Sequence, residues 1–320
     1  EELADPGQLR ARLSDIGITY GFTYYGEVFG NASGGFSRDR HFHGLIDVVT
    51  DIDLQTLIGW NGLTFHANMY RPHGTSITLE NAGTIAAVSH IEATPSTKLF
   101  EAWFEQSLLD GKASLRFGQL AADAEFATLE SSGAFISSTF GWNTLMTDNL
   151  PNGGPIFPIY NGDPVGPCDT DPQLCNEHGT NFRLSDPPLV MSEIAYSYNM
   201  GLRGTVKVGG WYSFNDFEDQ RFDVNRLSIA DPSSTGTAQL HQGNYGVYGV
   251  LYQMIHQVPG ASDKGIHLFS RVAVSPENRN QIDFYAEGGL TFSGLVPLRP
   301  DDVFAIGFAY TSISDHAAGL

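Results

Sequence analysis

The sequence has little charge, and positive charge is the scarcer kind. Charged residues make up 17% of the 320 positions, with 17 Lys and Arg against 36 Asp and Glu, so the formal net charge is −19. The basic residues form no cluster, and recognition of nucleic acid rests on clustered Lys and Arg that neutralise phosphates. We therefore expect no nucleic-acid partner.

Long apolar runs are missing too. No stretch approaches the roughly 18 apolar residues that a membrane-spanning helix needs. This absence does not exclude a membrane protein built from strands, because such strands alternate apolar and polar residues. We expect segment 1–17, which is polar and unlike a signal peptide, to be the start of a mature exported protein.

Cysteine is nearly absent. The two cysteines, Cys168 and Cys175, bracket the polar loop CDTDPQLC. Their spacing predicts a disulfide and hence an oxidising compartment, with two free loop thiols as the alternative. Two cysteines without a nearby pair of histidines make a poor zinc site.

The sequence is rich in period-two alternation, the pattern of strands with one apolar face. The runs are about 9–12 residues long, the length of a tilted strand crossing a bilayer, whereas strands of soluble sandwiches are nearer to about 5–6. Long loops are expected at 215–243 and around 121–187. The predicted strands are 18–29, 42–53, 62–71, 84–92, 98–108, 112–120, 188–199, 203–214, 245–256, 265–274, 281–292 and 302–313. An all-β fold follows, and the strand length favours a membrane barrel.

The hairpin FEAWFEQSLLDGKASLRFGQ, residues 100–119, indicates which face of these strands is inside. With Asp110 and Gly111 as the turn, Glu105 lies opposite Arg116, and the apolar residues share the other face. A lipid-facing Arg or Lys costs about 2–4 kcal/mol at the bilayer midplane. A cross-strand pair contributes only about 0.2–1 kcal/mol. The larger penalty favours an apolar face that points outward and charges that point into a pore.

Motifs along nearly the whole chain resemble those of the OprB-type carbohydrate-selective porins of bacterial outer membranes. They include YYGEVFGNASGG (24–35), LFEAWFEQSLLDGKASLRFGQLAADAEF (99–126), FGWN (140–143), YNGDPVGP (160–167), VGGWY (208–212), DFYAEGGLTFSGLVPLRPDDV (283–303) and AYTSISD (309–315). The resemblance implies a transmembrane antiparallel β-barrel of about 16 strands. It also implies passive diffusion of sugars through an eyelet that inward-folded loops narrow.

The resemblance predicts one barrel porin domain over residues 1–320, with 1–17 as a periplasmic N-terminal segment. Two departures affect the strand count. Members carry a strand where Pro158 here runs directly into Ile159. Members also continue beyond the ISD-like motif through further strands. We therefore expect some strands, the C-terminal ones included, to be absent from this sequence.

The orientation of the hairpin predicts the side chains that line the pore and contact solute. On the hairpin and the other strands they are Glu101, Trp103, Glu105, Arg116, Glu27, Asp47, Lys207, Trp211, Arg271, Asp283 and Tyr285, with Asp51, His66, Glu193 and Glu287 on the same faces. A polar wall with scattered aromatic rings suits sugars, because hydroxyls exchange water for polar partners and rings cover the apolar sugar face. Generic solvation of a pore wall is the alternative for each residue.

The predicted function is passive diffusion of carbohydrates, monosaccharides such as glucose, into the periplasm. The alternatives are a general small-solute porin without sugar preference and a soluble exported glycan-binding β protein. An enzyme is not expected. Glu101 and Glu105 on one strand face lie about 13 Å apart, beyond the roughly 5–9.5 Å that separates the carboxylates of glycosidases.

The expected partners are small sugars, outer-membrane lipids and lipopolysaccharide, and the expected state is a monomer, with a trimer as the alternative. No cofactor is expected. The alternative is Ca²⁺ at acidic loops such as that of Asp169 and Asp171. His41 and His43 share a strand face and could bind a metal, but a solvated strand end is the preferred interpretation.

Overall fold

The structure is a computed structural model that describes residues 8–151, 156–157, 176, 178–180 and 187–319. The strands are β1 (Ile18–Gly30), β2 (Arg40–Asp53), β3 (Leu63–Gly74), β4 (Lys98–Leu108), β5 (Ala113–Ala121), β6 (Ile156–Phe157), β7 (Leu189–Asn199), β8 (Arg203–Asp223), β9 (Ala238–Gln257), β10 (Gly265–Val274), β11 (Ile282–Ser293) and β12 (Val303–Ile313). The helices are α1 (Leu9–Asp15), α2 (Leu54–Ile58), α3 (Thr144–Asn149) and α5 (Asp315–Ala318), with single turns η2 (Thr78–Ala82), η3 (Ala122–Ala124), η4 (Ser132–Ala134), η5 (Ser138–Phe140) and η7 (Glu277–Arg279). In the part of the chain that the structure describes, no helix is long and apolar enough to cross a membrane.

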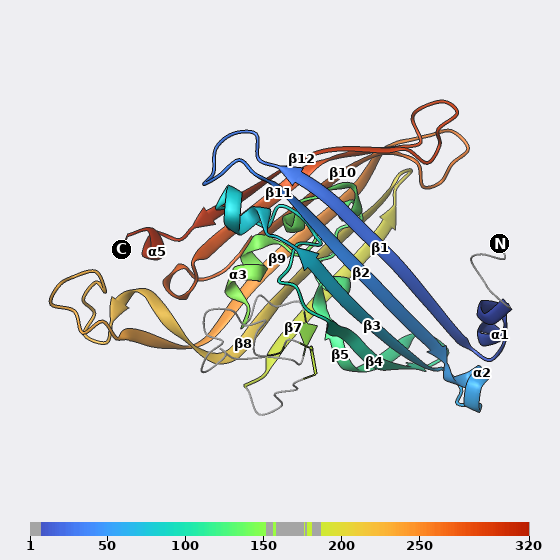
Figure 1. Ribbon diagram of the computed structural model, residues 1–320, viewed down its shortest axis with the longest axis horizontal. Coiled ribbons are helices and arrows are strands. Elements are labelled where there is room, and N and C mark those ends of the chain that lie inside the picture. Colours follow the sequence, from blue (N-terminus) through green and yellow to red (C-terminus); the bar gives the residue numbers. More distant parts are fainter. Residues whose placement is uncertain (1–7, 152–155, 158–175, 177, 181–186, 320) are drawn as a thin grey trace. The chain divides into compact units, whose positions relative to one another are not determined.

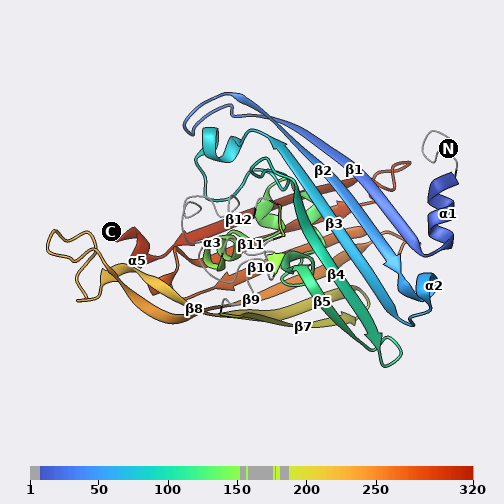
Figure 2. The same cartoon turned by 60° about the horizontal axis from the view of Figure 1, so that its bottom comes forward.

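The strands form two six-stranded antiparallel sheets in which each strand pairs with its neighbour in sequence (Figures 1 and 2). The first sheet runs from β1 to β6 and the second from β7 to β12. Among the described residues, no ladder closes either sheet on itself. The chain divides into two compact units: Glu1–Thr84, Ile91–Ala121 and Ile156–Leu184 form the first, and Ile85–His90, Ala122–Pro155 and Ser185–Leu320 form the second. One barrel domain over residues 1–320 stays a prediction.

The β4–β5 hairpin has the register that the sequence predicts. Glu105 is paired with Arg116, and the connection spans residues 109–112. Leu109 and Asp110 have φ values of 51° and 55°, and Gly111 has a φ of 80°. Three consecutive residues in this left-handed region reverse the chain tightly, and Asp and Gly tolerate that conformation.

Both sheets have one face of exposed apolar side chains. In the first sheet, Phe22 is 63% exposed, and Leu115 and Phe117 are exposed on the same face. In the second sheet, Ile194 and Val208 are exposed. Large apolar side chains in such numbers on one face of a sheet mark a surface that contacts an apolar environment.

The predicted strand at 84–92 is wrong, because this stretch lies in the loop between β3 and β4. His90 N–H donates to the Ile136 carbonyl (3.0 Å), and the Ser138 hydroxyl donates to the Ala87 carbonyl (3.0 Å). The backbone of residues 85–90 therefore bonds to another loop segment and not to a strand. Alternation alone does not distinguish these two outcomes.

The predicted long loop at 215–243 is mostly strand. β8 continues to Asp223 and β9 begins at Ala238, which leaves a connection of residues 224–237. The ladder between β8 and β9 shifts register twice, between Ser213 and Asp216 and between Glu218 and Asp223. These irregularities interrupt the alternation and hide the strand in the sequence. The other predicted strands are confirmed, and β6 is a short additional one that pairs with β5.

Candidate functional site

A row of stacked side chains crosses the polar face of the first sheet. The His66 ring on β3 stacks on the Trp103 indole of β4, with centroids 4.8 Å apart and planes 19° apart. The Arg116 guanidinium of β5 lies 4.0 Å from the centroid of the same indole. Because β3 and β5 flank β4, the indole lies between an imidazole and a guanidinium. We call His66, Trp103 and Arg116 the aromatic row.

Carboxylates border the aromatic row. Asp51 Oδ1 lies 2.6 Å from His66 Nδ1, and Glu101 Oε1 accepts a hydrogen bond from Trp103 Nε1 (3.0 Å). Glu105 Oε2 accepts from Arg116 through Nη2 (2.7 Å) and Nε (3.0 Å). The structure thus brings six of the predicted residues into one network: Asp51, His66, Glu101, Trp103, Glu105 and Arg116. Cross-strand register accounts for this, since His66 pairs with Trp103 and Glu105 with Arg116.

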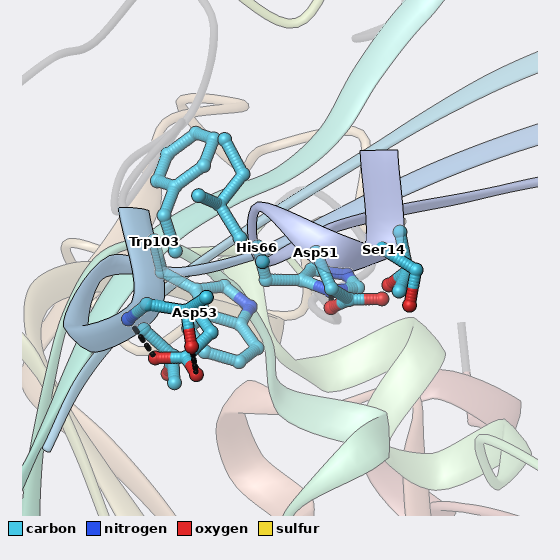
Figure 3. Close-up of a pocket in the computed structure, with 11 residues that line it drawn as sticks. Ser14, Asp51, Asp53, His66 and Trp103 are labelled. Atoms are coloured by element: carbon cyan, nitrogen blue, oxygen red, sulfur yellow. Dashed lines mark hydrogen bonds and ion pairs between the residues drawn. The ribbon is translucent and has the colours of Figure 1, made fainter. Parts of the chain in front are cut away.

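A pocket of ≈ 390 Å³ opens at one end of the aromatic row, beside α1 and α2 (Figure 3). Its wall includes Ser14, Asp51, Asp53, His66 and Trp103. The Asp53 carboxylate caps α2, accepting from Gln55 N–H (2.9 Å) and the Thr56 hydroxyl (2.7 Å). Asp51 keeps 56% of its side chain exposed. The pocket therefore offers carboxylate, imidazole and hydroxyl groups, which exchange hydrogen bonds with the hydroxyls of a small polar solute.

Other predicted residues of the first sheet lie away from the aromatic row. The Asp47 carboxylate accepts from Asn68 Nδ2 (2.7 Å), and Glu27 is half-buried on β1, paired in register with His43. The preferred interpretation of His41 and His43 as a solvated strand end is wrong. His41 is buried between Thr75 Oγ1 (2.7 Å) and Asn81 Oδ1 (2.6 Å), and His43 is 2% exposed.

The burial of His41 has a clear cause, because the loop that carries η2 folds back over the first residues of β2 and supplies Asn81. No group of three or more His, Cys, Asp or Glu side chains within the described ranges is placed to hold a metal ion. The predicted disulfide of Cys168 and Cys175 and the alternative calcium site at Asp169 and Asp171 lie outside the described residues.

In the second sheet, Arg271 is fully buried on the polar face. Its guanidinium donates to three backbone carbonyls at 2.8 Å each, those of Ala127, Thr139 and Gly141, and lies 2.9 Å from Glu287 Oε1. Tyr285 is also fully buried, and its hydroxyl accepts from Thr139 Oγ1 (2.9 Å). Both residues therefore contact the chain between β5 and β6 instead of open solvent.

Lys207 makes a similar contact with the same stretch of chain. Its ammonium donates to the Thr128 carbonyl (3.1 Å) and lies 3.7 Å from Glu193 Oε1. Trp211 is 4% exposed and Asp283 is half-buried. The sequence could not reveal these contacts, because the acceptors are backbone carbonyls of residues 127–141, which no side-chain pattern identifies.

Comparisons with known proteins agree with this architecture. The sequence profile of the family described as carbohydrate-selective porin, OprB family, matches residues 43–320. The chain is 24% identical to "Porin B" of Pseudomonas aeruginosa over 98% of its own length and 74% of that protein. It is 20% identical to a "Putative porin QuiX" of Acinetobacter baylyi over 96% of its length and 73% of that protein.

Solved structures show the same fold. The high-pH structure of Pseudomonas putida OprB superposes with a TM-score of 0.84 at 21% identity, covering 98% of this chain and 80% of that one. The low-pH structure of the same protein gives a TM-score of 0.59 at 15% identity, covering 97% and 82%. The chain thus has the all-β fold of these porins.

Proposed function

The chain belongs to the OprB family of carbohydrate-selective porins, which are channels of the bacterial outer membrane, and from this premise we propose that it passes monosaccharides such as glucose into the periplasm by passive diffusion. Membership removes the alternative of a soluble glycan-binding protein. It supports a transport channel, and we propose that the polar faces of the sheets form the walls of this channel. Of the predicted pore-lining residues, we propose Glu101, Trp103, Glu105 and Arg116 as part of these walls, whereas the buried Arg271 and Tyr285 lie behind the chain between β5 and β6.

One observation carries the choice of a small neutral sugar. The aromatic row is bordered by Asp51, Glu101 and Glu105, so ring surface alternates with hydrogen-bonding groups along one wall. Sugars present hydroxyls around an apolar ring face, and such a wall satisfies both. Each contact is weak, as conduction requires, because a solute that binds at one tight site does not leave.

Recordings in planar bilayers and swelling of liposomes test the proposal. We expect glucose to block the ion current of the purified protein reversibly and to enter liposomes faster than a neutral disaccharide. Trp103→Ala should raise the half-blocking glucose concentration by about three- to tenfold, the equivalent of one lost aromatic contact. Trp60→Ala is the matched control, because Trp60 lies outside the aromatic row and is 58% exposed.

The near alternative is a general porin without sugar preference. It predicts that uptake depends only on solute size, so that glucose and a polyol of the same mass enter liposomes at equal rates. It also predicts that Trp103→Ala leaves the half-blocking glucose concentration unchanged. A channel whose current glucose leaves unchanged contradicts the proposed function. We further propose that the protein works as a monomer in contact with lipid and lipopolysaccharide, which light scattering of the detergent-solubilised protein checks against a trimer.

A further inference from the structure

The chain between β5 and β6 lies on the polar face of the second sheet and is fixed to it at several points. Residues 127–144, which we call the wall segment, contain η4 and η5 and the start of α3. The carbonyls of Ala127, Thr139 and Gly141 all accept from Arg271, each at 2.8 Å. One buried side chain therefore ties together three backbone positions that are up to 14 residues apart in sequence.

The charge of Arg271 is compensated inside the sheet. Arg271 and Glu287 are register partners on β10 and β11, and both are essentially inaccessible to solvent. Guanidinium and carboxylate lie 2.9 Å apart, and the Tyr285 hydroxyl donates to the same carboxylate. A buried charge persists only when it is paired and hydrogen-bonded. Arg271 thus uses its donors on the wall segment and on Glu287 and leaves little for a passing solute.

Ala127 is held from both sides. Its N–H donates to Glu193 Oε2 (2.8 Å), which also accepts from the Tyr248 hydroxyl (2.9 Å), and its carbonyl accepts from Arg271. Ala127 has a φ of 54° and is fully buried. A left-handed conformation at a residue other than Gly persists where its surroundings over-determine it. The sheet therefore imposes the backbone geometry at which the wall segment begins.

Aromatic packing also fixes the wall segment to the sheet through apolar contacts. Phe135 and Phe140 stack with ring centroids 4.0 Å apart, and both meet the buried Phe269 of β10 edge-on, at 5.4 and 6.2 Å. Phe269 and Arg271 are two residues apart on β10 and therefore lie on the same face of the strand, so one strand supplies both the apolar and the charged contact. Such packing resists displacement in any direction.

We propose that Arg271 and Glu193 are positioning residues that hold the wall segment as a fixed part of the channel wall, so that sugar selectivity depends on two side chains that do not contact sugar. The inference rests on the proposed function. Lysine cannot replace Arg271, because one ammonium cannot reach three carbonyls and a carboxylate in a planar fork. A wall segment without its anchor should move into and out of the path of the solute.

The test combines hydrogen exchange with single-channel recording on the whole protein. The double variant Arg271→Met/Glu287→Met removes both buried charges and leaves neither unpaired. We expect amide exchange of residues 127–144 to rise by about tenfold or more while the strands keep their protection. The half-blocking glucose concentration should rise several-fold, and the open-channel current should become noisier.

Arg279→Met is the matched control, since Arg279 also donates to a backbone carbonyl of the second unit, that of Gly243 (2.7 Å), but has none of the contacts of Arg271 with the wall segment. Where the double variant does not fold, Glu193→Leu and Arg271→Lys supply the same comparison. Unchanged exchange of residues 127–144 in a folded variant overturns the inference. Exchange needs no sugar, so a wild type that glucose does not block refutes the proposed function and leaves this test in force.

Discussion

Arg116 has two partners at once, the Glu105 carboxylate and the face of the Trp103 ring. Its side chain is 27% exposed, so both interactions compete with water. Exposed ion pairs contribute about 0.2–1 kcal/mol, and exposed cation–π contacts about 0.5–1 kcal/mol. Arg116 therefore contributes little to folding, but it places a positive charge on a wall bordered by three carboxylates.

Arg116→Ala should make the channel more selective for cations and weaken sugar block, with a loss of stability of about 1–2 kcal/mol at most. The reversal potential in a KCl gradient measures the selectivity, and glucose titration of the current measures the block. Lys112→Ala is the control, because it removes a positive charge from the exposed turn of the same hairpin. Identical reversal potentials and block in wild type and Arg116→Ala would reduce the residue to ordinary wall lining.

Residues differ in how far the sequence reveals their partners. The pair of Glu105 and Arg116 could be predicted, because a short turn fixes the register of a hairpin and the register fixes which side chains meet. The partners of Arg271 could not be predicted, since they are carbonyls more than a hundred residues away in the chain. Lumen orientation follows from alternation, whereas cover by the wall segment follows from tertiary contacts.

At the scale of elements, the connection between β8 and β9 is organised by one carboxylate at the end of β8. Asp223 Oδ1 accepts from the N–H groups of Asn225 (2.8 Å) and Leu227 (2.9 Å). Its Oδ2 accepts from Thr235 N–H (2.9 Å) and from the hydroxyls of Ser234 and Thr235 (3.0 Å each). The two ends of the loop 224–237 thus meet on one side chain, as in compact loops that pack upon themselves.

Asp223→Ala should loosen this loop, because five hydrogen bonds to a charged acceptor are lost. The channel should keep its conductance, because the loop lies outside both polar faces described above. The expected result is cleavage by trypsin after Arg226, an exposed residue within the loop, at a rate at least several-fold above that of wild type. Glu218→Ala removes an exposed carboxylate from the same strand and should leave cleavage unchanged. Equal cleavage in the two variants would mean that Asp223 does not organise the loop.

Most strands are readable from alternation, because a strand with one apolar and one polar face imposes period two on its sequence. The exceptions have physical causes. Residues 84–92 alternate, but their backbone groups bond to residues 136–138 and not to a neighbouring strand. The outer parts of β8 and β9 are strands without clean alternation, since the register shifts twice between them. Pairing decides strand formation, and pairing is not a local property.

At the scale of the whole molecule, the formal net charge of −19 should act differently on ions and on sugars. A negative potential raises the local concentration of cations and lowers that of anions, and it has no first-order effect on a neutral solute. Salt screens it, since the Debye length falls from about 10 Å at 0.1 M to about 3 Å at 1 M. Contacts between a neutral sugar and the aromatic row act at van der Waals and hydrogen-bond distance and are hardly screened.

Raising KCl from about 0.1 to 1 M should therefore lower the preference of the channel for cations, while the half-blocking glucose concentration changes by less than about twofold. A sugar acid of the same size is the matched probe, because its carboxylate is repelled at low salt and its block should strengthen as salt increases. Reversal potentials and block titrations on one preparation give all three quantities. A glucose block that follows ionic strength as the sugar acid does would show that the field of the protein, and not the row of His66, Trp103 and Arg116, governs sugar entry.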